Sequence, residues 1–315
     1  MIRFEHVGKD YAGWTAIEDL SLTVEKGEFC VLIGPSGSGK TTTLKMINRL
    51  IEHDRGRILF EGAEIRSFAP EELRRRMGYA IQSIGLFPHW TVEENIGAVP
   101  KLLGWPRAKI RDRVTELLEM LTLDPERYRA RYPRHLSGGE QQRIGVARAL
   151  AANPSVLLMD EPFGALDPVT RDTLQAEMLR IQAASGTTVV LVTHDIDEAI
   201  RLASRIVILE GGRIAQSGSP REILAAPAND FVADFVGRSD RGLRLLAAER
   251  VGDRMRRGET AVGEPLPVDA SLREALSLFV ARNVDRLPVQ DGSGALIGAI
   301  RLADLVRPPP SEAAP

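Results

Sequence analysis

The chain has 315 residues, of which 43% are hydrophobic and 27% are charged. This length and composition predict one large domain with a small second one, and they exclude disordered and fibrous classes. The formal net charge is −2, so the chain lacks the cationic surplus that attracts nucleic acid through counterion release. We therefore predict no nucleic-acid partner.

The single cysteine, Cys30, lies inside an apolar run, which favours a buried thiol and excludes a disulfide within one chain. Residues 1–5 lack the charged-then-apolar pattern of a signal peptide. No run approaches the roughly 18 uninterrupted apolar residues that span a bilayer. We expect a cytoplasmic chain that reaches a membrane only through a partner.

The first strands are predicted at residues 2–7 and 20–24, where apolar residues alternate, and at 56–60. Tyr11 falls in the loop between the first two strands. Its ring is a candidate for stacking on an adenine face, with an ordinary half-buried tyrosine as the alternative. Trp14 is the next candidate for this stacking.

The stretch Gly-Pro-Ser-Gly-Ser-Gly-Lys-Thr follows the apolar run 29–33 and matches the P-loop pattern GxxxxGK[ST]. Its glycines let successive backbone N–H groups converge on one anion, and a helix predicted at 42–50 adds its N-terminal dipole. Lys40 reaches the β- and γ-phosphates, while the Thr41 hydroxyl faces Mg²⁺. The predicted nucleotide-binding residues of this stretch are Gly34, Pro35, Ser36, Gly37, Ser38, Gly39, Lys40, Thr41 and Thr42, with Lys40 also catalytic and Thr41 also a metal ligand.

Residues 86–150 show no strand pattern and predict a helical insert. Within it, 106–121 opens with a proline and carries an apolar stripe at helical spacing, which predicts a core helix. Short apolar runs then recur at 156–159, 188–192 and 205–209, between helical stretches. Such runs are typical of strands buried on both faces of a parallel sheet.

Asp160 and Glu161 come directly after the run 156–159, at the carboxyl end of a strand, where α/β sheets bind ligands. Asp160 suits the Mg²⁺ shell, and Glu161 suits polarising the attacking water as a general base. The alternative, that two acids merely end a strand, is disfavoured by the P-loop upstream.

Residues 136–143, Leu-Ser-Gly-Gly-Glu-Gln-Gln-Arg, are the most specific stretch of the chain. Ser137 and Glu140 also spell a capping box, and a helix start with two glycines exposes backbone amides to an anion. With this stretch, the P-loop and the two acids, residues 1–237 resemble the ATP-binding cassette (ABC) ATPase family. The chain differs from the family pattern at Glu140, where the family more often has glutamine.

The resemblance implies a homodimer that binds ATP and Mg²⁺, because the family's signature closes over the γ-phosphate held by the P-loop of the opposite subunit. Gln82 falls at the family's Q-loop glutamine, and residues 165–167 look like its D-loop. His194 matches the switch histidine that contacts the γ-phosphate. The implied residues are Ser137, Gly138, Gly139, Glu140 and Asp167 for the nucleotide, Gln82 and His194 for catalysis, and Gln82 also for the metal.

The runs 41–50, 84–96 and 99–105 resemble the ATPases of importers of quaternary amines such as glycine betaine, carnitine and choline. This resemblance implies permease subunits as partners, an extracytoplasmic solute-binding protein as an indirect partner, and a peripheral place at the cytoplasmic side of the membrane. Another solute, such as an amino acid or polyamine, is the second hypothesis. A soluble ABC ATPase acting on nucleic acid or ribosomes is the third hypothesis. A P-loop kinase is excluded, because such an enzyme does not need the stretch 136–143.

The polar break at 237–240 is the predicted domain boundary. Beyond it, a capping box at Ser271 predicts a helix to Asn283, and 286–290 with 296–300 predict a hairpin. Residues 308–315 are predicted to be disordered.

Residues 248–306 resemble a single CBS motif, which normally packs in pairs, so we expect two tails to pair across the homodimer. Asp304 matches the family's ribose-binding aspartate, but Arg301 takes the usual Ser/Thr position. A dimerising tail and a sensor of ionic strength or of a nucleotide both remain open. The predicted fold class is an α/β P-loop NTPase of ABC type at 1–237, with a mixed sheet core, an antiparallel β subdomain and a helical subdomain, plus a small α+β CBS-like domain at 240–307.

Overall fold

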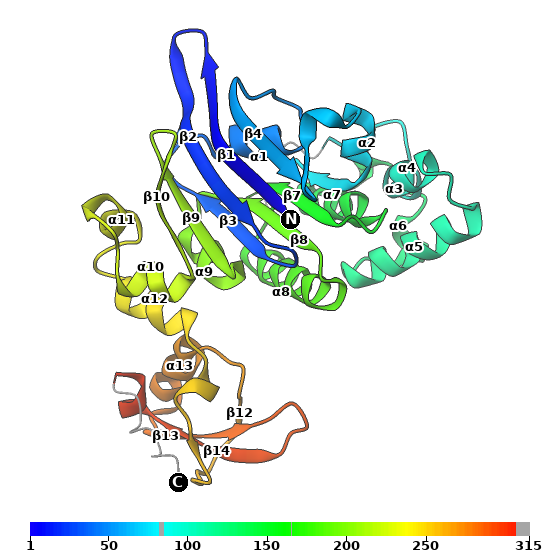
Figure 1. Ribbon diagram of the computed structural model, residues 1–315. Coiled ribbons are helices and arrows are strands. Elements are labelled where there is room, and N and C mark those ends of the chain that lie inside the picture. The colour runs from blue at the N-terminus through cyan, green and yellow to red at the C-terminus, as the bar shows by residue number, and fades with distance from the viewer. Residues whose placement is uncertain (82–84, 165, 307–315) are drawn as a thin grey trace. The chain divides into compact units, whose positions relative to one another are not determined.

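The structure is a computed structural model that describes residues 1–81, 85–164 and 166–306. It divides into two compact units, one of residues 1–217 and one from residue 218 onward, which we describe separately (Figure 1). The predicted domain bounds of 1–237 and 240–307 stay a prediction, because two compact units of the structure need not coincide with two domains of the chain.

A four-stranded antiparallel sheet in the order β2-β1-β4-β5 begins the first unit. β1 (Ile2–Tyr11) pairs with β2 (Trp14–Val24) along their whole length, so that Tyr11 lies opposite Trp14. The prediction that Tyr11 lies in a loop is therefore wrong, since it is the last residue of β1. The remaining strands of this sheet are β4 (Arg55–Phe60) and β5 (Ala63–Glu64).

A six-stranded sheet in the order β10-β9-β3-β8-β7-β6 forms the centre of the first unit. All residues of β3 (Phe29–Ile33), β7 (Val156–Asp160) and β8 (Thr188–Val192) are buried, and β3 and β7 both pair with β8 in parallel. The predicted runs 156–159, 188–192 and 205–209 thus form parallel strands, because β7 pairs with β8 and the third run pairs with β3 in parallel. The outer strands are β6 (Met77–Ala80), β9 (Arg205–Glu210) and β10 (Arg213–Gly218).

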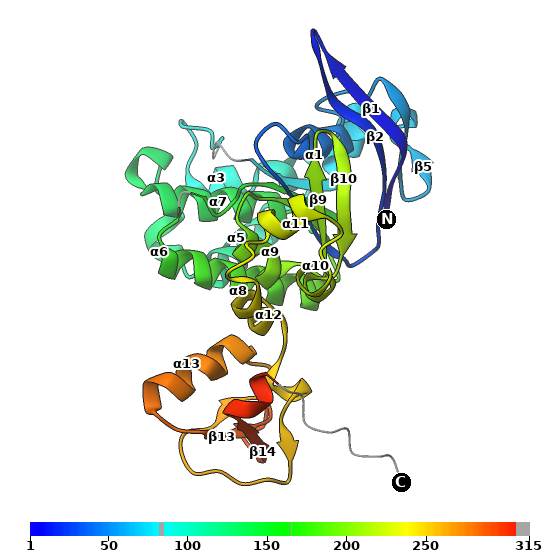
Figure 2. The same cartoon turned by 90° about the vertical axis from the view of Figure 1, so that its left-hand side faces the viewer.

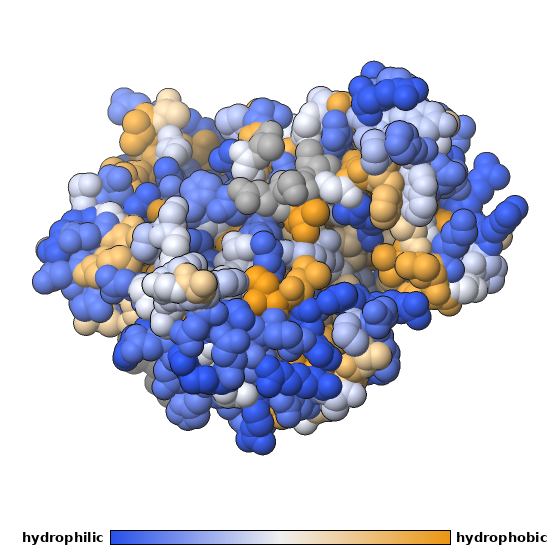
Figure 3. All heavy atoms as spheres, turned by 90° about the horizontal axis from the view of Figure 1, so that it is seen from above, coloured by the Kyte–Doolittle hydropathy of each residue, from blue (hydrophilic) through white to orange (hydrophobic). Residues whose placement is uncertain are grey.

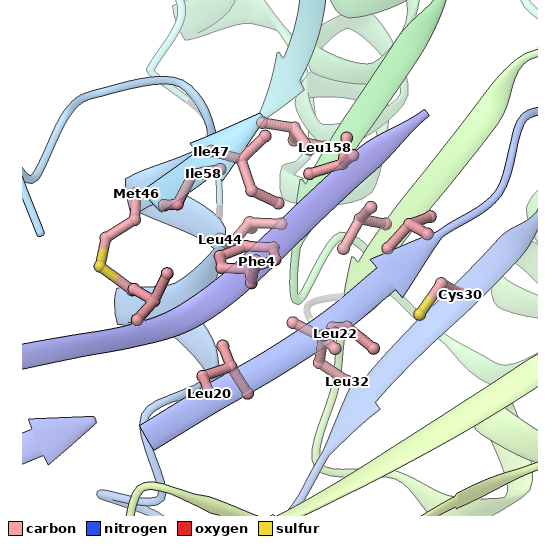
Figure 4. Close-up of a cluster of buried hydrophobic side chains, with 14 of the residues drawn as sticks. Phe4, Leu20, Leu22, Cys30, Leu32, Leu44, Met46, Ile47, Ile58 and Leu158 are labelled. Carbon is pink, nitrogen blue, oxygen red and sulfur yellow. The ribbon is translucent and has the colours of Figure 1, made fainter. Parts of the chain in front are cut away.

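The main core fills the space between the two sheets, where Phe4, Leu20, Leu32, Leu44 and Leu158 pack together (Figure 4). Leu44 belongs to α1 (Lys40–Ile47), which follows the P-loop. Burying each such side chain stabilises the fold by roughly 1.5–3 kcal/mol. The core therefore fixes α1 and β7, the two elements that carry the phosphate loop and the acidic pair.

Helices joined by loops make up the chain from Val92 to Leu150, and the described residues between 85 and 150 contain no strand, as predicted. Val114, Leu117 and Leu118 form the buried stripe of α5 (Arg107–Met120). Figure 1 shows this group of helices together at one end of the first unit. The others in the group are α3 (Val92–Ile96), α4 (Ala98–Leu102), α6 (Pro125–Tyr128) and α7 (Gly138–Leu150).

The remaining helices of the first unit are α2 (Pro70–Arg75), α8 (Pro168–Ser185) and α9 (Ile196–Leu202). Figure 2 shows α8 and α9 on the side of the central sheet away from α1. Both begin with aspartate caps, because Asp167 and Asp195 accept hydrogen bonds from first-turn amides. Parallel strands are thereby covered on both faces, which is the arrangement that continuous apolar strands require.

The second unit is a small α+β assembly with a sheet in the order β11-β14-β13-β12. As predicted, α13 (Leu272–Arg282) starts at the capping box of Ser271 and ends at Asn283, which is left-handed. The predicted hairpin is β13 (Arg286–Gln290) with β14 (Leu296–Arg301). The other elements are α10 (Pro220–Ala225), α11 (Asp230–Phe235), α12 (Arg241–Ala248), β11 (Arg256–Arg257) and β12 (Leu266–Pro267).

The Asp304 carboxylate of this unit is buried and bonded within the chain. Arg256 donates to it from Nη2 at 2.7 Å and from Nε at 3.0 Å. Arg301 pairs instead with Glu259, at 2.6 Å. The tail at 308–315, predicted to be disordered, lies outside the described residues.

Candidate nucleotide site

The P-loop joins the carboxyl end of β3 to the first turn of α1. Gly34 has φ +154°, and a Cβ there would lie 2.2 Å from the Leu209 carbonyl oxygen, so no other residue fits. Gly39 is the N-cap of α1 and provides no side-chain cap. The first-turn amides of α1 therefore keep their donors for an external anion.

Lys40 is buried, and its Nζ donates to the carbonyl oxygens of Gly34 at 2.8 Å and Pro35 at 2.9 Å. Burial lowers the pKa of Lys40, while the nearby carboxylates of Glu161 and Asp160 oppose this shift. The Lys40 ammonium thus lies inside the P-loop, the loop predicted to bind the phosphates. An anion beside it would complete the neutralisation of a partly desolvated charge.

The remaining loop residues vary in exposure. Pro35, Ser36 and Gly37 are exposed, Thr42 is half-buried, and Ser38 is buried. The Ser38 hydroxyl oxygen has no hydrogen-bond partner among the described residues. Such an orphaned group at a helix start fits a site whose ligand supplies the missing contact.

Thr41 and Asp160 meet across the sheet edge, since Thr41 Oγ1 donates to Asp160 Oδ1 at 3.0 Å. Asp160 is 4% exposed, and burial raises the pKa of its carboxyl despite this hydrogen bond. One hydroxyl and one carboxylate are the hard oxygen donors that Mg²⁺ takes together with phosphate oxygens. The two predicted metal ligands that the structure describes are therefore brought together, whereas Gln82, the third, lies outside the described residues.

Glu161 and His194 follow the neighbouring strands β7 and β8, and His194 Nδ1 lies 3.2 Å from Glu161 Oε1. The parallel register places Asp160 opposite Val192, so the residues after these strands share one edge. Glu161 has φ +46°, and its N–H donates to the Val192 carbonyl at 2.9 Å. This left-handed conformation costs about 1–3 kcal/mol in a non-glycine residue.

The exposed residue Ser137 caps α7, and its hydroxyl accepts from Glu140 N while Glu140 Oε2 accepts from Ser137 N at 2.6 Å. Gly138 is also exposed, and a Cβ added there would touch nothing. The predicted capping box is confirmed. Asp167, the described aspartate of the predicted D-loop, caps α8, and its neighbour Ala165 lies outside the described residues.

Tyr11 and Trp14 stack on one another, with ring centroids 5.4 Å apart and planes inclined by 21°. Both rings are partly exposed, at 37% and 51%. An adenine face would thus meet a pair of rings. The predicted stacking role of Tyr11 stays a prediction.

Two neighbours of the predicted residues were assigned no role from the sequence, although one of them, Gln142, lies within the stretch 136–143. Tyr128 Oη donates to Glu140 Oε1 at 2.5 Å, from the end of α6. Gln142 Nε2 lies 3.4 Å from the Glu161 carbonyl oxygen, from within α7. Both contacts join segments that are well separated in sequence, so local patterns could not indicate them.

A pocket of 1010 Å³ lies away from the P-loop and contains none of its residues. Trp90, Trp105 and residues of α3 and α5 line it.

Among the helices that the structure describes, none is long and apolar enough to cross a membrane. On the face in Figure 3, apolar side chains form separate patches within a mostly hydrophilic surface.

Comparisons with known proteins agree with this geometry. A family model described as ABC transporter matches residues 17–164, and one described as CBS domain matches 264–309. The glycine betaine uptake system ATP-binding protein YehX of Escherichia coli (strain K12) is 58% identical over 97% of this chain and 99% of its own. The glycine betaine/carnitine/choline transport ATP-binding protein OpuCA of Bacillus subtilis (strain 168) is 51% identical over 95% of this chain and 78% of its own.

Among solved structures, the dimeric structure of MJ0796, a bacterial ABC transporter cassette, matches with a TM-score of 0.65 at 34% identity. It covers 70% of this chain and 98% of that one. A second dimeric structure of MJ0796, in a post-hydrolysis state bound to ADP and Pi, matches with a TM-score of 0.63 at 33% identity, again over 70% and 98%. The fold and the site together define a P-loop ATPase cassette. The chain belongs to the ABC transporter family, as one of its ATP-binding proteins.

Proposed function

We propose that the chain hydrolyses ATP to energise an importer of quaternary amines of the glycine betaine, carnitine and choline type. The observation that carries the ATPase part is the sheet edge where Lys40, Thr41, Asp160, Glu161 and His194 gather. The solute class is supported by the functions of YehX and OpuCA, whose matches extend over 95–97% of the chain. Import of another solute, such as an amino acid or polyamine, is the alternative.

Glu161 is the general base of this proposal. Its carboxylate takes a proton from the attacking water, whose oxygen forms a bond to the γ-phosphorus as the bond to the β–γ bridging oxygen breaks. His194, 3.2 Å away, restrains this carboxylate and donates to the γ-phosphate. Lys40 and the amides of the loop neutralise the phosphate charge, so positioning supplies most of the rate.

Mg²⁺ fits the donors that Thr41 and Asp160 bring together. The pKa of Asp160 is raised by burial, and a cation beside the carboxylate offsets that cost. When bound, Mg²⁺ neutralises charge on the β- and γ-phosphate oxygens. Gln82 is the proposed third contact of the metal and a catalytic residue, on the strength of the resemblance alone.

The nucleotide site is completed by a second copy of the chain. Ser137, Gly138, Gly139 and Glu140 start α7 at the surface, where their amides and the helix dipole are ready for the γ-phosphate of a partner's ATP. The dimeric MJ0796 cassettes support this arrangement. Asp167 is proposed to lie near the same nucleotide, and Tyr11 to stack on its adenine.

The homodimer acts on permease subunits in the membrane and, through them, on an extracytoplasmic solute-binding protein. This follows from the uptake and transport systems to which YehX and OpuCA belong. The chain is then peripheral, at the cytoplasmic side of the membrane. We propose no nucleic-acid partner, since the net charge of −2 offers no electrostatic drive for one.

The test is ATP hydrolysis by the complete complex, reconstituted in vesicles with its permease and solute-binding protein. Glycine betaine, carnitine and choline should each raise hydrolysis above the solute-free rate, whereas proline and putrescine should not. A Glu161→Gln complex, as matched control, should show no stimulation. Stimulation by proline or putrescine alone would support the alternative importer.

A further inference from the structure

The start of α7 is held from outside its own helix by Tyr128. This residue ends α6 and is 8% exposed, and its Oη donates to Glu140 Oε1 at 2.5 Å. The other oxygen of the same carboxylate, Oε2, accepts from Ser137 N at 2.6 Å. One carboxylate therefore joins the Tyr128 hydroxyl to the Ser137 cap.

The charges of this arrangement make the contact strong. Burial raises the pKa of the Glu140 carboxyl, but hydrogen bonds from Tyr128 and Ser137 outweigh burial and hold that pKa below its usual value. The pKa of Tyr128 is raised, first by its hydrogen bond to Glu140 and then by burial. At neutral pH the acceptor is thus ionised and the donor protonated, and such charge-assisted bonds are about twice as strong as neutral ones.

Tyr128 is itself fixed by the chain around it. Val92 N and Glu93 N, in the first turn of α3, donate to the carbonyls of Arg131 at 2.8 Å and Arg129 at 3.1 Å. Arg129 Nη1 also lies 3.2 Å from Glu93 Oε1. The segment that follows Tyr128 is thereby tied to α3, so the tyrosine offers a rigid anchor for the start of α7.

Three other capping boxes with a serine or threonine cap show that a cap forms without such a tyrosine. Thr91 with Glu94, Ser219 with Glu222 and Ser271 with Glu274 each make the same reciprocal pair of bonds. Throughout the described ranges, no tyrosine hydroxyl bonds to these three glutamates. The contact of Tyr128 is therefore an addition to the box at Ser137 rather than a requirement of it.

We propose that Tyr128 is a positioning residue for closure of the ATP-bound dimer. Through Glu140 it holds Ser137 and the following amides in the orientation in which they meet the γ-phosphate on a second copy. Without the hydroxyl, the box of Ser137 and Glu140 still forms, but the helix start loses its outside anchor. This inference rests on the proposed function and adds a residue that the P-loop and signature patterns do not contain.

The first experiment uses the full chain carrying Glu161→Gln, which is expected to dimerise with ATP. The ATP concentration that makes half of the protein dimeric is measured by analytical ultracentrifugation, with and without Tyr128→Phe. Tyr128→Phe should raise this concentration about tenfold, since two such hydrogen bonds support each closed dimer. The control, Tyr132→Phe, removes a hydroxyl four residues away that does not bond to Glu140, and should leave the concentration unchanged.

A second set of measurements separates positioning from folding. In the chain without Glu161→Gln, Tyr128→Phe should raise KM for ATP while kcat stays within about twofold. ATP binding to the monomer, at protein concentrations too low for dimers, should be unchanged, whereas the thermal midpoint without nucleotide should fall by the few degrees that the loss of one hydrogen bond costs. Equal dimerisation and equal KM would overturn the proposal, and so would a matching loss of ATP binding by the monomer. If Glu161→Gln itself never dimerises with ATP, the proposed function fails, and the KM comparison still decides the role of Tyr128.

Discussion

His194 Nδ1 lies 3.2 Å from Glu161 Oε1, so the residues that follow β8 and β7 are in direct contact at one edge of the central sheet. Glu161 is 23% exposed and His194 is 69% exposed, which leaves the pair open to a substrate from outside. The parallel pairing of Asp160 with Val192 sets this distance. A contacting carboxylate and imidazole at an open edge are suited to orient a water and a phosphate together.

Replacement of Glu161 by glutamine should abolish turnover without abolishing nucleotide binding. Gln has the shape of Glu but cannot take a proton from water, so hydrolysis should fall by about 10²–10⁴-fold. The variant should accumulate as an ATP-bound dimer. Phosphate release and size-exclusion chromatography measure the two effects, and turnover at the parental rate would rule out Glu161 as the base.

Replacement of His194 by alanine should lower kcat by on the order of 10²-fold, since it removes a donor to the γ-phosphate and the restraint on Glu161. ATP binding to the monomer should change little, because the P-loop is untouched. His135→Ala, at an exposed histidine before the α7 cap, is the matched control and should keep parental activity. Equal activity of the two variants would refute the assigned role of His194.

Replacement of Asp160 by asparagine should stabilise the nucleotide-free chain at pH 7 while abolishing hydrolysis. The folded-state pKa of Asp160 is raised by burial, so its contribution to stability is present below the unfolded-state pKa and is lost as pH rises through the folded-state pKa. The gain in thermal midpoint from Asp160→Asn should therefore shrink as pH falls below the ordinary range of aspartate. A gain that does not depend on pH would contradict this reading.

Replacement of Leu158 by alanine should lower the free energy of unfolding by about 2–5 kcal/mol, because this fully buried side chain of β7 lies in the core between the two sheets. Leu102→Ala changes a side chain that is 66% exposed and should stay within about 0.5 kcal/mol. Urea unfolding of the two variants compares these costs. Equal losses would show that the core of Figure 4 does not dominate stability.

The sequence predicted those parts of the site whose chemistry is local. The P-loop, the acidic pair and the Ser137 box are each contiguous, and each needs only its neighbours to form. The contact of His194 with Glu161 depends instead on the pairing of β7 with β8, which the sequence indicated only through two buried apolar runs. The contact between the His194 and Glu161 side chains is seen only in the structure.

The misjudged elements have physical causes. The alternation of β1 ends at Val7 in the sequence because the strand contains register shifts, with His6 at φ +51°, so the extension to Tyr11 had no periodic signal. β6 was not predicted because Met77–Ala80 is short and contains Gly78. A Cβ at Gly78 would lie 2.3 Å from the Ala149 carbonyl oxygen, so the close approach of α7 accounts for the glycine.

The central claim is that ATP is hydrolysed between the P-loop of one copy and the Ser137 cap of another. Mixing a Lys40→Ala chain with a Ser137→Glu chain tests it most directly. Neither homodimer has a working site, whereas the mixed dimer has one site in which both Lys40 and Ser137 are intact. The mixture should recover up to about a quarter of parental hydrolysis, as expected for random pairing of two copies. A mixture no more active than its separate components, or full hydrolysis by Ser137→Glu as a monomer, would contradict the claim.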